Sequence, residues 1–354
     1  WRLDKALDHE AIYYSALVCM IDAIRHGTTT LIDHHASPNA ISGSLDDIAQ
    51  AALESGLRVS TCYEVTDRDG KEKARAGIEE NIRFIRRYEK AELPERIFPT
   101  FGLHASLTLD DDTLETCASA IPQGYGFHIH VAEHQVDEFD SIFRSGKRTI
   151  ERLDAFRILN PLTIVVHAVH IDAREMQIIK EREAWVSHQP RSNMNNAVGL
   201  PQVEGMLNLG IPVCLGNDGF SNAMWDEWKA AYLAHKLWNR DPRRMGAASV
   251  AKMAWVNNAK LVQKLSGSEV GVIKEGAKAD LILVDYKPFT PLSVENLPWQ
   301  LVFGFQNSMV TTTIVDGKVL MRNGAITVLD EEQVMRAALQ LAPKVWERYA
   351  QQFS

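Results

Sequence analysis

The stretch Tyr-Gly-Phe-His-Ile-His-Val-Ala-Glu at residues 125–133 decides the fold class, because a chemically active pair directly follows a buried strand. Its first seven residues predict a β-strand, with His130 near its end and Glu133 three residues further on. His167 and Asp218 likewise stand at the ends of apolar, strand-like runs. Three strand ends therefore offer two imidazoles and two carboxylates, which could form one site if the ends converge.

Helical and strand patterns alternate along the first three quarters of the chain. The predicted strands are 28–33, 57–65, 97–103, 125–131, 162–166, 184–187 and 213–216, and the predicted helices are 11–26, 45–55, 72–90, 111–120, 149–158, 173–183, 203–209, 224–239 and 246–261. Such alternation predicts a parallel sheet with helical crossovers. The count of seven strands is one short of a (β/α)8 TIM-type barrel.

Polar side chains follow all seven of these strands. They are His34, His35, Glu64, His104, His130, His167, His188 and Asp218. Barrel enzymes place their active sites at the C-terminal ends of the strands, whereas an open doubly wound sheet concentrates them at one switch point. Polar groups after every strand therefore favour the barrel.

The pattern changes after residue 265. An apolar strand is predicted at 281–285, and two more, at 311–315 and 318–321, flank Asp316-Gly317, a strong hairpin signal. A last helix is predicted at 331–349. We therefore divide the chain into a barrel at 1–265, a small β module at 266–325 that belongs to a composite sandwich, and a C-terminal helix at 326–354 that packs on the barrel.

Composition narrows the classes of partner. The chain has 354 residues, and 38 basic against 46 acidic side chains give a net charge of −8, which argues against nucleic acid. No apolar run reaches the length of a membrane span. The four cysteines form no CxxC pair, so we expect reduced thiols and a cytoplasmic location. We expect a small-molecule substrate, and the sequence allows a homodimer.

The residue types at the strand ends suit metal-assisted hydrolysis. Catalytic metal sites use a few His and carboxylate ligands and keep one position for water. His130 and Asp218 suit ligands, Glu133 suits a proton shuttle, and His167 suits either a ligand or a polarising group. The competing interpretation is structural: Glu133 as the first-turn acid of a helix and His130 as a buried, hydrogen-bonded imidazole.

The segment 186–196 is dense in hydrogen-bonding groups just past a strand. Its Asn195 and Asn196 are more simply explained by turn geometry, whereas His188 is balanced between a structural and a functional role. At 34–35, one histidine should face the barrel mouth while the other packs outward. We expect the substrate contacts to come from His34, His35, His104, His188, Arg191 and Asn193.

Four ordered motifs resemble the amidohydrolase superfamily, in its deaminase and chlorohydrolase branch. They are HVAE at 130–133, VHAVH at 166–170, SHQPRSN at 187–193 and GNDG at 216–219, and GAKADLILVD at 276–285 resembles the strand that these enzymes add to their sandwich. IDHHASP at 32–38, EENIRF at 79–84 and RSNMNN at 191–196 resemble SsnA-type aminohydrolases, a group associated with selenium-dependent purine catabolism.

The resemblance implies a role for each residue. His130 and Asp218 would hold one divalent metal, zinc with iron as the alternative. Glu133 would carry a proton from water to the substrate, His167 would polarise the attacked centre, and Asp218 would accept a proton from the attacking water. The implied reaction is hydrolysis of a C–N bond in a nitrogen heterocycle with release of ammonia. A hydrolase of a cyclic amide or of a chloride leaving group is the near alternative, and a catalytically silent scaffold is the distant one.

One departure from the family pattern limits these expectations. The family places a His-x-His ligand pair after its first strand, but the His-x-His of this chain, at 128–130, belongs to the fifth. We therefore expect the first strand to lie upstream of Trp1. A chain with only His130 and Asp218 as ligands should bind metal weakly and be impaired in activity.

Overall fold

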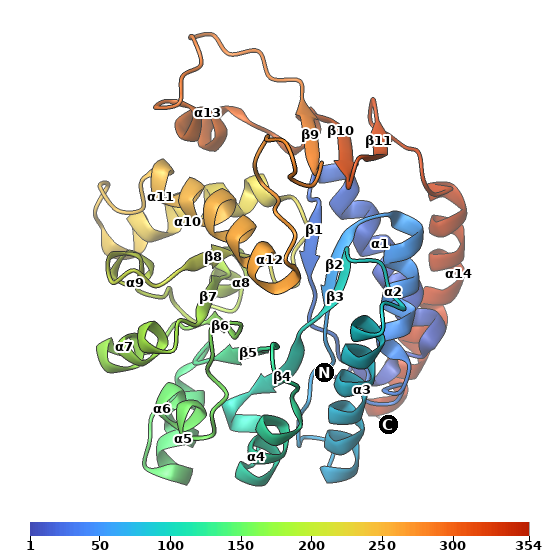
Figure 1. Ribbon diagram of the computed structural model, residues 1–354, viewed down its shortest axis with the longest axis vertical. Coiled ribbons are helices and arrows are strands. Elements are labelled where there is room, and N and C mark those ends of the chain that lie inside the picture. The colour runs from blue at the N-terminus through green and yellow to red at the C-terminus, as the bar shows by residue number, and fades with distance from the viewer. Residues whose placement is uncertain (354) are drawn as a thin grey trace.

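The computed structural model describes residues 1–353, and parallel strands form its centre (Figure 1). The strands are β1 (Thr30–Ile32), β2 (Arg58–Thr61), β3 (Ile97–Pro99), β4 (Phe101–Ala105), β5 (Phe127–Val131), β6 (Ile164–His167), β7 (Trp185–His188) and β8 (Val213–Leu215). They pair in chain order, as the sheets β1-β2-β3 and β4-β5-β6-β7-β8. This parallel arrangement confirms the predicted α/β class.

The two sheets form one wall of seven strand positions. β3 and β4 are two halves of the single strand predicted at 97–103, and the break follows Pro99, which has no N–H to donate to a ladder. An isolated parallel bridge from Val65 to Leu103 connects the two sheets, and another from His35 to Tyr63 extends the pairing of β1 with β2. The strand predicted at 57–65 is likewise a short ladder, β2, followed by these single bridges.

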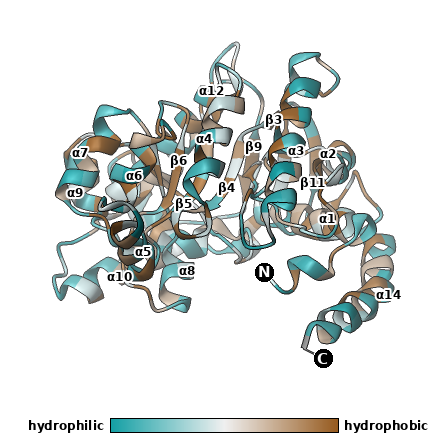
Figure 2. Ribbon diagram, turned by 90° about the horizontal axis from the view of Figure 1, so that it is seen from below, coloured by the Kyte–Doolittle hydropathy of each residue, from teal (hydrophilic) through white to brown (hydrophobic). Residues whose placement is uncertain are grey.

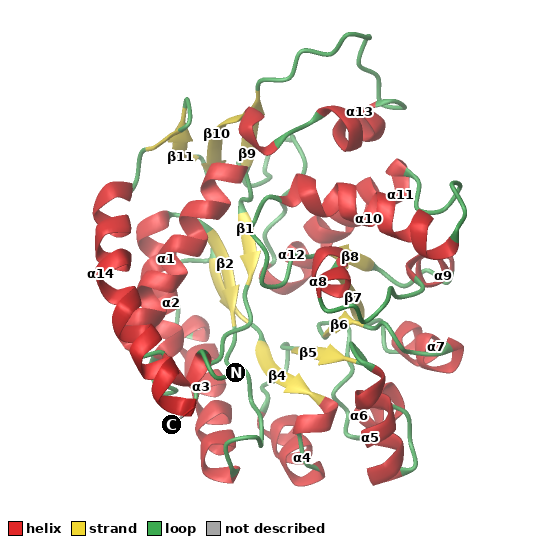
Figure 3. Ribbon diagram, turned by 180° about the vertical axis from the view of Figure 1, so that it is seen from behind, coloured by secondary structure: helices red, strands yellow, loops and turns green. Residues whose placement is uncertain are grey.

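Helices surround the strands, as Figure 3 shows in red and yellow. They are α1 (His9–His26), α2 (Ser44–Ser55), α3 (Lys71–Glu89), α4 (Asp111–Ala120), α5 (Gln135–Ser145), α6 (Thr149–Ala155), α7 (Ala173–Glu181), α8 (Pro190–Asn195), α9 (Val203–Asn208), α10 (Met224–Asn239), α11 (Ala247–Ala251) and α12 (Asn258–Ser266). Two helices, α5 and α8, were not predicted from the sequence, and the helix predicted at 246–261 is interrupted by a π-helical segment, Lys252–Asn257.

The core lies between the strands and their helices. Phe101, Phe127 and Ile129 are at most 1% exposed and belong to one large apolar cluster. Figure 2 shows the same contrast, with brown residues on the inner strands and teal stretches on the surrounding helices. Within residues 1–353, no helix combines the length and apolar character that a bilayer crossing requires.

β1 and β8 are the edge strands of the wall. A cavity of about 790 Å³ lies between them, lined by residues of β1 and β8 and extending to His34, Glu64, His130 and Asp218. The resemblance places a further strand at this edge, and that strand remains a prediction.

A separate antiparallel sheet lies beside the barrel strands. Its order is β12 (Ala325–Ile326), β11 (Lys318–Arg322), β10 (Val310–Val315) and β9 (Leu281–Val284). Asp316 and Gly317 have φ of 50° and 78°, which confirms the predicted hairpin turn. A Cβ at Gly27, the predicted cap of α1, would lie 3.1 Å from Val310, so glycine permits this close approach.

The C-terminal part also contains α13 (Leu297–Gly304) and α14 (Glu331–Ala350). α14 lies along α1 at the right of Figure 1. Its Arg348 donates to the Ala6 carbonyl at 2.7 Å and pairs with Asp8 at 2.6 Å, which ties the two ends of the described chain together.

Candidate active site

The strand register brings the predicted site residues to one end of the wall. His130 pairs with Val166 and Val131 with His167, so the ends of β5 and β6 are level. His188 pairs with Leu215, three residues before Asp218. Parallel pairing with aligned ends therefore places polar side chains from the four consecutive strands β5 to β8 at the same end of the wall, which we call the rim.

Glu133, His167 and Asp218 form one cluster. His167 Nε2 lies 3.7 Å from Glu133 Oε2 and 3.9 Å from Asp218 Oδ2. Glu133 accepts a hydrogen bond from Asn196 Nδ2 at 2.9 Å, and Asp218 accepts one from Ser192 Oγ at 2.5 Å. The cluster therefore joins one buried imidazole to two partly exposed carboxylates, at separations longer than a hydrogen bond.

Backbone strain marks the same positions. His167 and Asp218 have φ of 71° and 51°, and Ala132, next to Glu133, has φ of 46°. Residues with a Cβ rarely adopt this left-handed conformation, which costs about 1–3 kcal/mol and persists where the surroundings impose it.

Three of the predicted substrate contacts lie behind the rim. Asn193 is fully buried and its Oδ1 is 2.9 Å from His167 Nδ1. His188 is fully buried and its Nε2 is 3.0 Å from Nε2 of His235 on α10. Arg191 is paired with Glu227 and donates to a backbone carbonyl. In this structure all three have protein partners, and Asn193 positions His167.

The two histidines at 34–35 point to different surroundings. His34 lines the cavity with its ring 4.7 Å from that of His130, whereas His35 Nε2 lies 2.9 Å from Ser37 Oγ. This is the inward and outward division that the sequence predicts. His104 stands on the other side of His130, with ring centroids 5.5 Å apart, and its Nδ1 contacts Thr108 Oγ1 at 2.7 Å.

Burial lowers the pKa of two of the inner imidazoles. Burial, with the neighbouring His34 and His167, lowers the pKa of His130 to about 4, and burial lowers the pKa of His104 to about 3. Glu64 behaves oppositely: burial raises its pKa, but the hydrogen bond from His34 and the nearby imidazoles outweigh burial and hold it well below its usual range. Burial lowers the pKa of His34, but its hydrogen bond and charge interaction with Glu64 outweigh burial and raise that pKa above its usual value.

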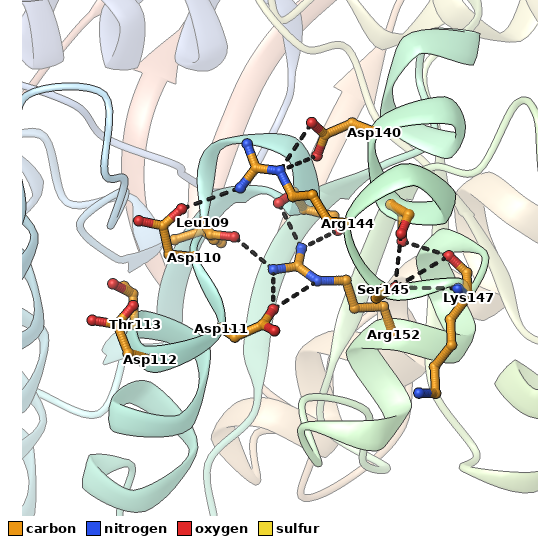
Figure 4. Close-up of polar contacts among 12 residues, drawn as sticks. Leu109, Asp110, Asp111, Asp112, Thr113, Asp140, Arg144, Ser145, Lys147 and Arg152 are labelled. Carbon is orange, nitrogen blue, oxygen red and sulfur yellow. Dashed lines mark hydrogen bonds and ion pairs between the residues drawn. The ribbon is translucent and has the colours of Figure 1, made fainter.

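Buried side chains fix the loops that carry these groups. Asp137 accepts from the N–H of Ala132 at 2.8 Å and of Leu107 at 2.9 Å, which links the turn before Glu133 to the loop after His104. Arg152 of α6 is 1% exposed and donates to the carbonyls at 106 and 109 of the same loop (Figure 4).

Several of these contacts were not anticipated from the sequence. Glu64 was recognised only as a strand-end carboxylate, and Asn196 was assigned to turn geometry, although it reaches Glu133. A polar loop beside a predicted proton shuttle was the available signal for Asn196. His235 lies within the predicted helix 224–239, where nothing local distinguishes it from a surface residue.

The donor set of the rim suits a divalent metal of the zinc type. Imidazole nitrogens and carboxylate oxygens are the ligands of catalytic zinc sites. Within residues 1–353, the one group of three or more metal-binding side chains whose ligand atoms converge within 4.8 Å is His34, Glu64 and His130. Of the predicted ligand pair, the structure thus places His130 in a converging group and Asp218 in the neighbouring cluster with His167.

A parallel barrel wall with imidazoles and carboxylates at its rim defines a hydrolase-type site. Residues 1–320 match the family described as the Amidohydrolase family, and the chain belongs to this family. This confirms the resemblance, and with it the expected barrel fold.

Curated relatives agree with this assignment. The chain is 34% identical over 353 residues to a 5'-deoxyadenosine deaminase of Methanosarcina mazei, covering 98% of this chain and 79% of the relative. It is 32% identical over 355 residues to a 5-methylthioadenosine/S-adenosylhomocysteine deaminase of Pelotomaculum thermopropionicum, covering 98% and 78%. The family and these relatives confirm the expected class of hydrolases that act on C–N bonds other than peptide bonds.

Solved structures show the same fold. An adenosine deaminase from Xanthomonas campestris with bound zinc superimposes with a TM-score of 0.85 at 21% identity, covering 98% of this chain and 78% of that one. Atrazine chlorohydrolase TrzN from Arthrobacter aurescens, complexed with zinc, superimposes with a TM-score of 0.81 at 20% identity, covering 96% and 78%.

Proposed function

We propose that this protein is a metal-dependent aminohydrolase that removes the ring amino group of an adenosine-type nucleoside. The observation that carries the proposal is the Glu133, His167 and Asp218 cluster on the rim of the barrel wall. The substrate class comes from relatives at 32–34% identity that are named as deaminases of 5'-deoxyadenosine and of 5-methylthioadenosine/S-adenosylhomocysteine.

The reaction converts an amino-substituted ring carbon and water into a ring carbonyl and ammonia. Asp218 takes a proton from the attacking water, and Glu133 delivers a proton to the adjacent ring nitrogen and then to the leaving amine. Asn196 holds the Glu133 carboxylate, and Ser192 holds that of Asp218. When its Nε2 carries a proton, His167 can donate to the oxygen that attacks, and Asn193 fixes the orientation of its ring.

A divalent metal, zinc with iron as the alternative, fits the rim through His130, with Asp218 as the second predicted ligand. When bound, such a metal would lower the pKa of a water to about 7 and so supply a nucleophile at neutral pH. Support comes from the donor types at the rim and from the zinc bound in two solved structures of the same fold.

Ammonia release from purified protein tests the proposal. The protein, with its metal content measured, is incubated with adenosine, 5'-deoxyadenosine, 5'-methylthioadenosine and S-adenosylhomocysteine, and separately with guanine, pterins and atrazine. We expect ammonia and the matching inosine-type product from the first group. Glu133→Gln, with unchanged circular dichroism and metal content, should lose activity by at least a hundredfold, because the proton shuttle is removed.

Two results would overturn the proposal. Metal-loaded protein that releases no ammonia from any of these compounds would exclude an aminohydrolase of this substrate class. Chloride from atrazine, or a ring-opened acid from a cyclic amide without ammonia, would instead support a hydrolase with a different leaving group.

A further inference from the structure

The helix α5 has its polar and apolar faces the opposite way round from an ordinary surface helix. The side chains that it turns inward are polar, since Asp137, Glu138 and Ser141 are at most 3% exposed. Its apolar side chains face outward, with Phe143 91% exposed and Phe139 64% exposed. A helix on the surface of a globular protein normally buries its apolar stripe. α5 therefore presents an apolar face to solvent.

Four side chains make up this face, which we call the α5 patch: Val136, Phe139, Ile142 and Phe143. They recur at spacings of three and four residues, so they lie along one side of the helix. None of the four lines the cavity of about 790 Å³. The patch is therefore not a part of the candidate active site that would be covered by a small substrate.

Buried hydrogen bonds prevent α5 from turning the patch inward. Asp137 accepts from the N–H of Ala132 at 2.8 Å and from that of Leu107 at 2.9 Å. Glu138 accepts from the N–H of Thr149 at 3.1 Å. A rotation that buried the patch would take both carboxylates away from these donors and leave buried N–H groups without acceptors, which is costly. The outward orientation of the patch is therefore fixed by the fold.

The size of the patch matches what one partner contributes to a dimer. At the observed exposures its four side chains offer on the order of 450 Å² of apolar surface. A standard interface buries about 800 Å² per partner, of which about 56–65% is apolar, which corresponds to roughly 450–520 Å². The patch alone would thus supply most of the apolar area that a stable interface needs.

The charged residues beside the patch are of both signs. Arg144 lies between Asp140 and Asp110, at 3.0 and 3.1 Å (Figure 4). A flank that carries acids and a base can face a second copy of itself, because a two-fold axis lets each sign meet the opposite one. An anionic membrane surface is disfavoured as the occupant by the net charge of −8.

We propose that the α5 patch is the centre of an interface with a second copy of this chain, related to the first by a two-fold axis. The patch of each copy then covers that of the other, so the same residues meet on both sides. Phe139 and Phe143 are the anchors, because a few central aromatic side chains carry most of the binding energy of an interface. The inference concerns association alone and holds or fails independently of the proposed function.

Sedimentation velocity of the purified protein tests this interface. The concentration series runs from about 0.1 to 100 μM, because interfaces of this size have Kd values from micromolar downward. We expect a species of twice the mass of one chain. Phe143→Lys and Phe139→Lys should each raise the Kd of the dimer at least about thirtyfold, as for a hot-spot aromatic residue. Both side chains are exposed in one chain alone, so circular dichroism should show an unchanged fold.

Leu237→Lys is the matched control, because Leu237 of α10 is 82% exposed but lies outside the α5 patch. It should leave the Kd within about threefold of the unmodified value. The proposal is overturned if the protein stays monomeric throughout the series, or if the dimer survives Phe139→Lys and Phe143→Lys. Loss of the dimer in Leu237→Lys alone would place the interface on α10 instead. A monomer that floats with phosphatidylglycerol vesicles would identify the patch as a membrane contact, which also overturns the proposal.

Discussion

Replacing Arg152 by methionine should destabilise the protein by about 4 kcal/mol. The Arg152 side chain is 1% exposed and crosses from α6 to the loop after β4. It donates at 2.8 Å to the carbonyls of Ser106 and Leu109, and at 2.7 Å to Asp111 (Figure 4). Methionine keeps most of the side-chain volume but leaves the two carbonyls without this donor.

The magnitude follows from these contacts. Each buried carbonyl that loses its partner costs about 1–3 kcal/mol, so two cost about 2–6 kcal/mol. The ion pair with Asp111 adds less than about 1 kcal/mol, because that carboxylate is 62% exposed. At about 2.1 cal/mol/K per residue, unfolding 354 residues has an entropy near 0.7 kcal/mol/K, so a loss of about 4 kcal/mol lowers Tm by roughly 5 °C.

Thermal and urea unfolding followed by circular dichroism measure this loss. Arg182→Met is the matched control, because Arg182 makes a two-bond pair with Asp154 at a side-chain exposure of 52%. The control should change the free energy of unfolding by less than about 1 kcal/mol. If the Arg152 variant also stayed within 1 kcal/mol, the reasoning that orphaned carbonyls dominate would be wrong.

Three further predictions concern titration and the proton shuttle. Burial lowers the pKa of His235 to about 4, so the contribution of the neutral imidazole to stability is fully present above pH 6.5 and is lost as the pH falls to about 4. His235→Gln should therefore weaken the pH dependence of the free energy of unfolding, measured with urea, between pH 4 and 6.5. An unchanged pH dependence would contradict this expectation. Burial and the nearby Glu175 raise the pKa of Glu138 to about 7. Between pH 4.5 and 7 the folded chain therefore holds a proton that the unfolded chain has lost, so stability should fall as the pH rises through this range. Glu138→Gln should remove that decline in the same urea assay. Asn196→Ala removes the hydrogen-bond donor to Glu133 and should lower kcat for ammonia release about tenfold, which corresponds to about 1.4 kcal/mol. The control is Asn195→Ala, which loses only the contact of Asn195 with Asn196 and should lower kcat less.

The alternation of elements was predictable because each local signal is strong. The predicted hairpin turn Asp316-Gly317 and the predicted cap Gly27 need left-handed backbone, which their residue types favour. The helix α5 was missed because its exposed Phe139 and Phe143 do not follow the usual pattern of a buried apolar stripe. The break after Pro99 depends on how two sheets meet, which no short window of sequence contains.

The candidate site also has features that the sequence predicted and features that it did not. The strand-end positions of His130, His167 and Asp218 were readable from the sequence, because side chains at the ends of neighbouring parallel strands face one rim. That Asn193 supports the ring of His167, and that His188 is paired with His235, was not readable. These partners are 26 and 47 residues apart in the chain and meet only when the strands and helices pack.

The sequence by itself determined the class of protein. It predicted parallel strands with polar side chains at their C-terminal ends, and the order of its motifs indicated the family that the match confirms. Only the tertiary structure decided which groups share a site. Periodicity and turn chemistry act over a few residues, so they specify elements and their ends. The ring nitrogens of His34 and His130 instead contact carbonyl oxygens of β4 and β5 that lie 26 to 94 residues away in the chain. Such contacts exist only after the strands have packed beside one another.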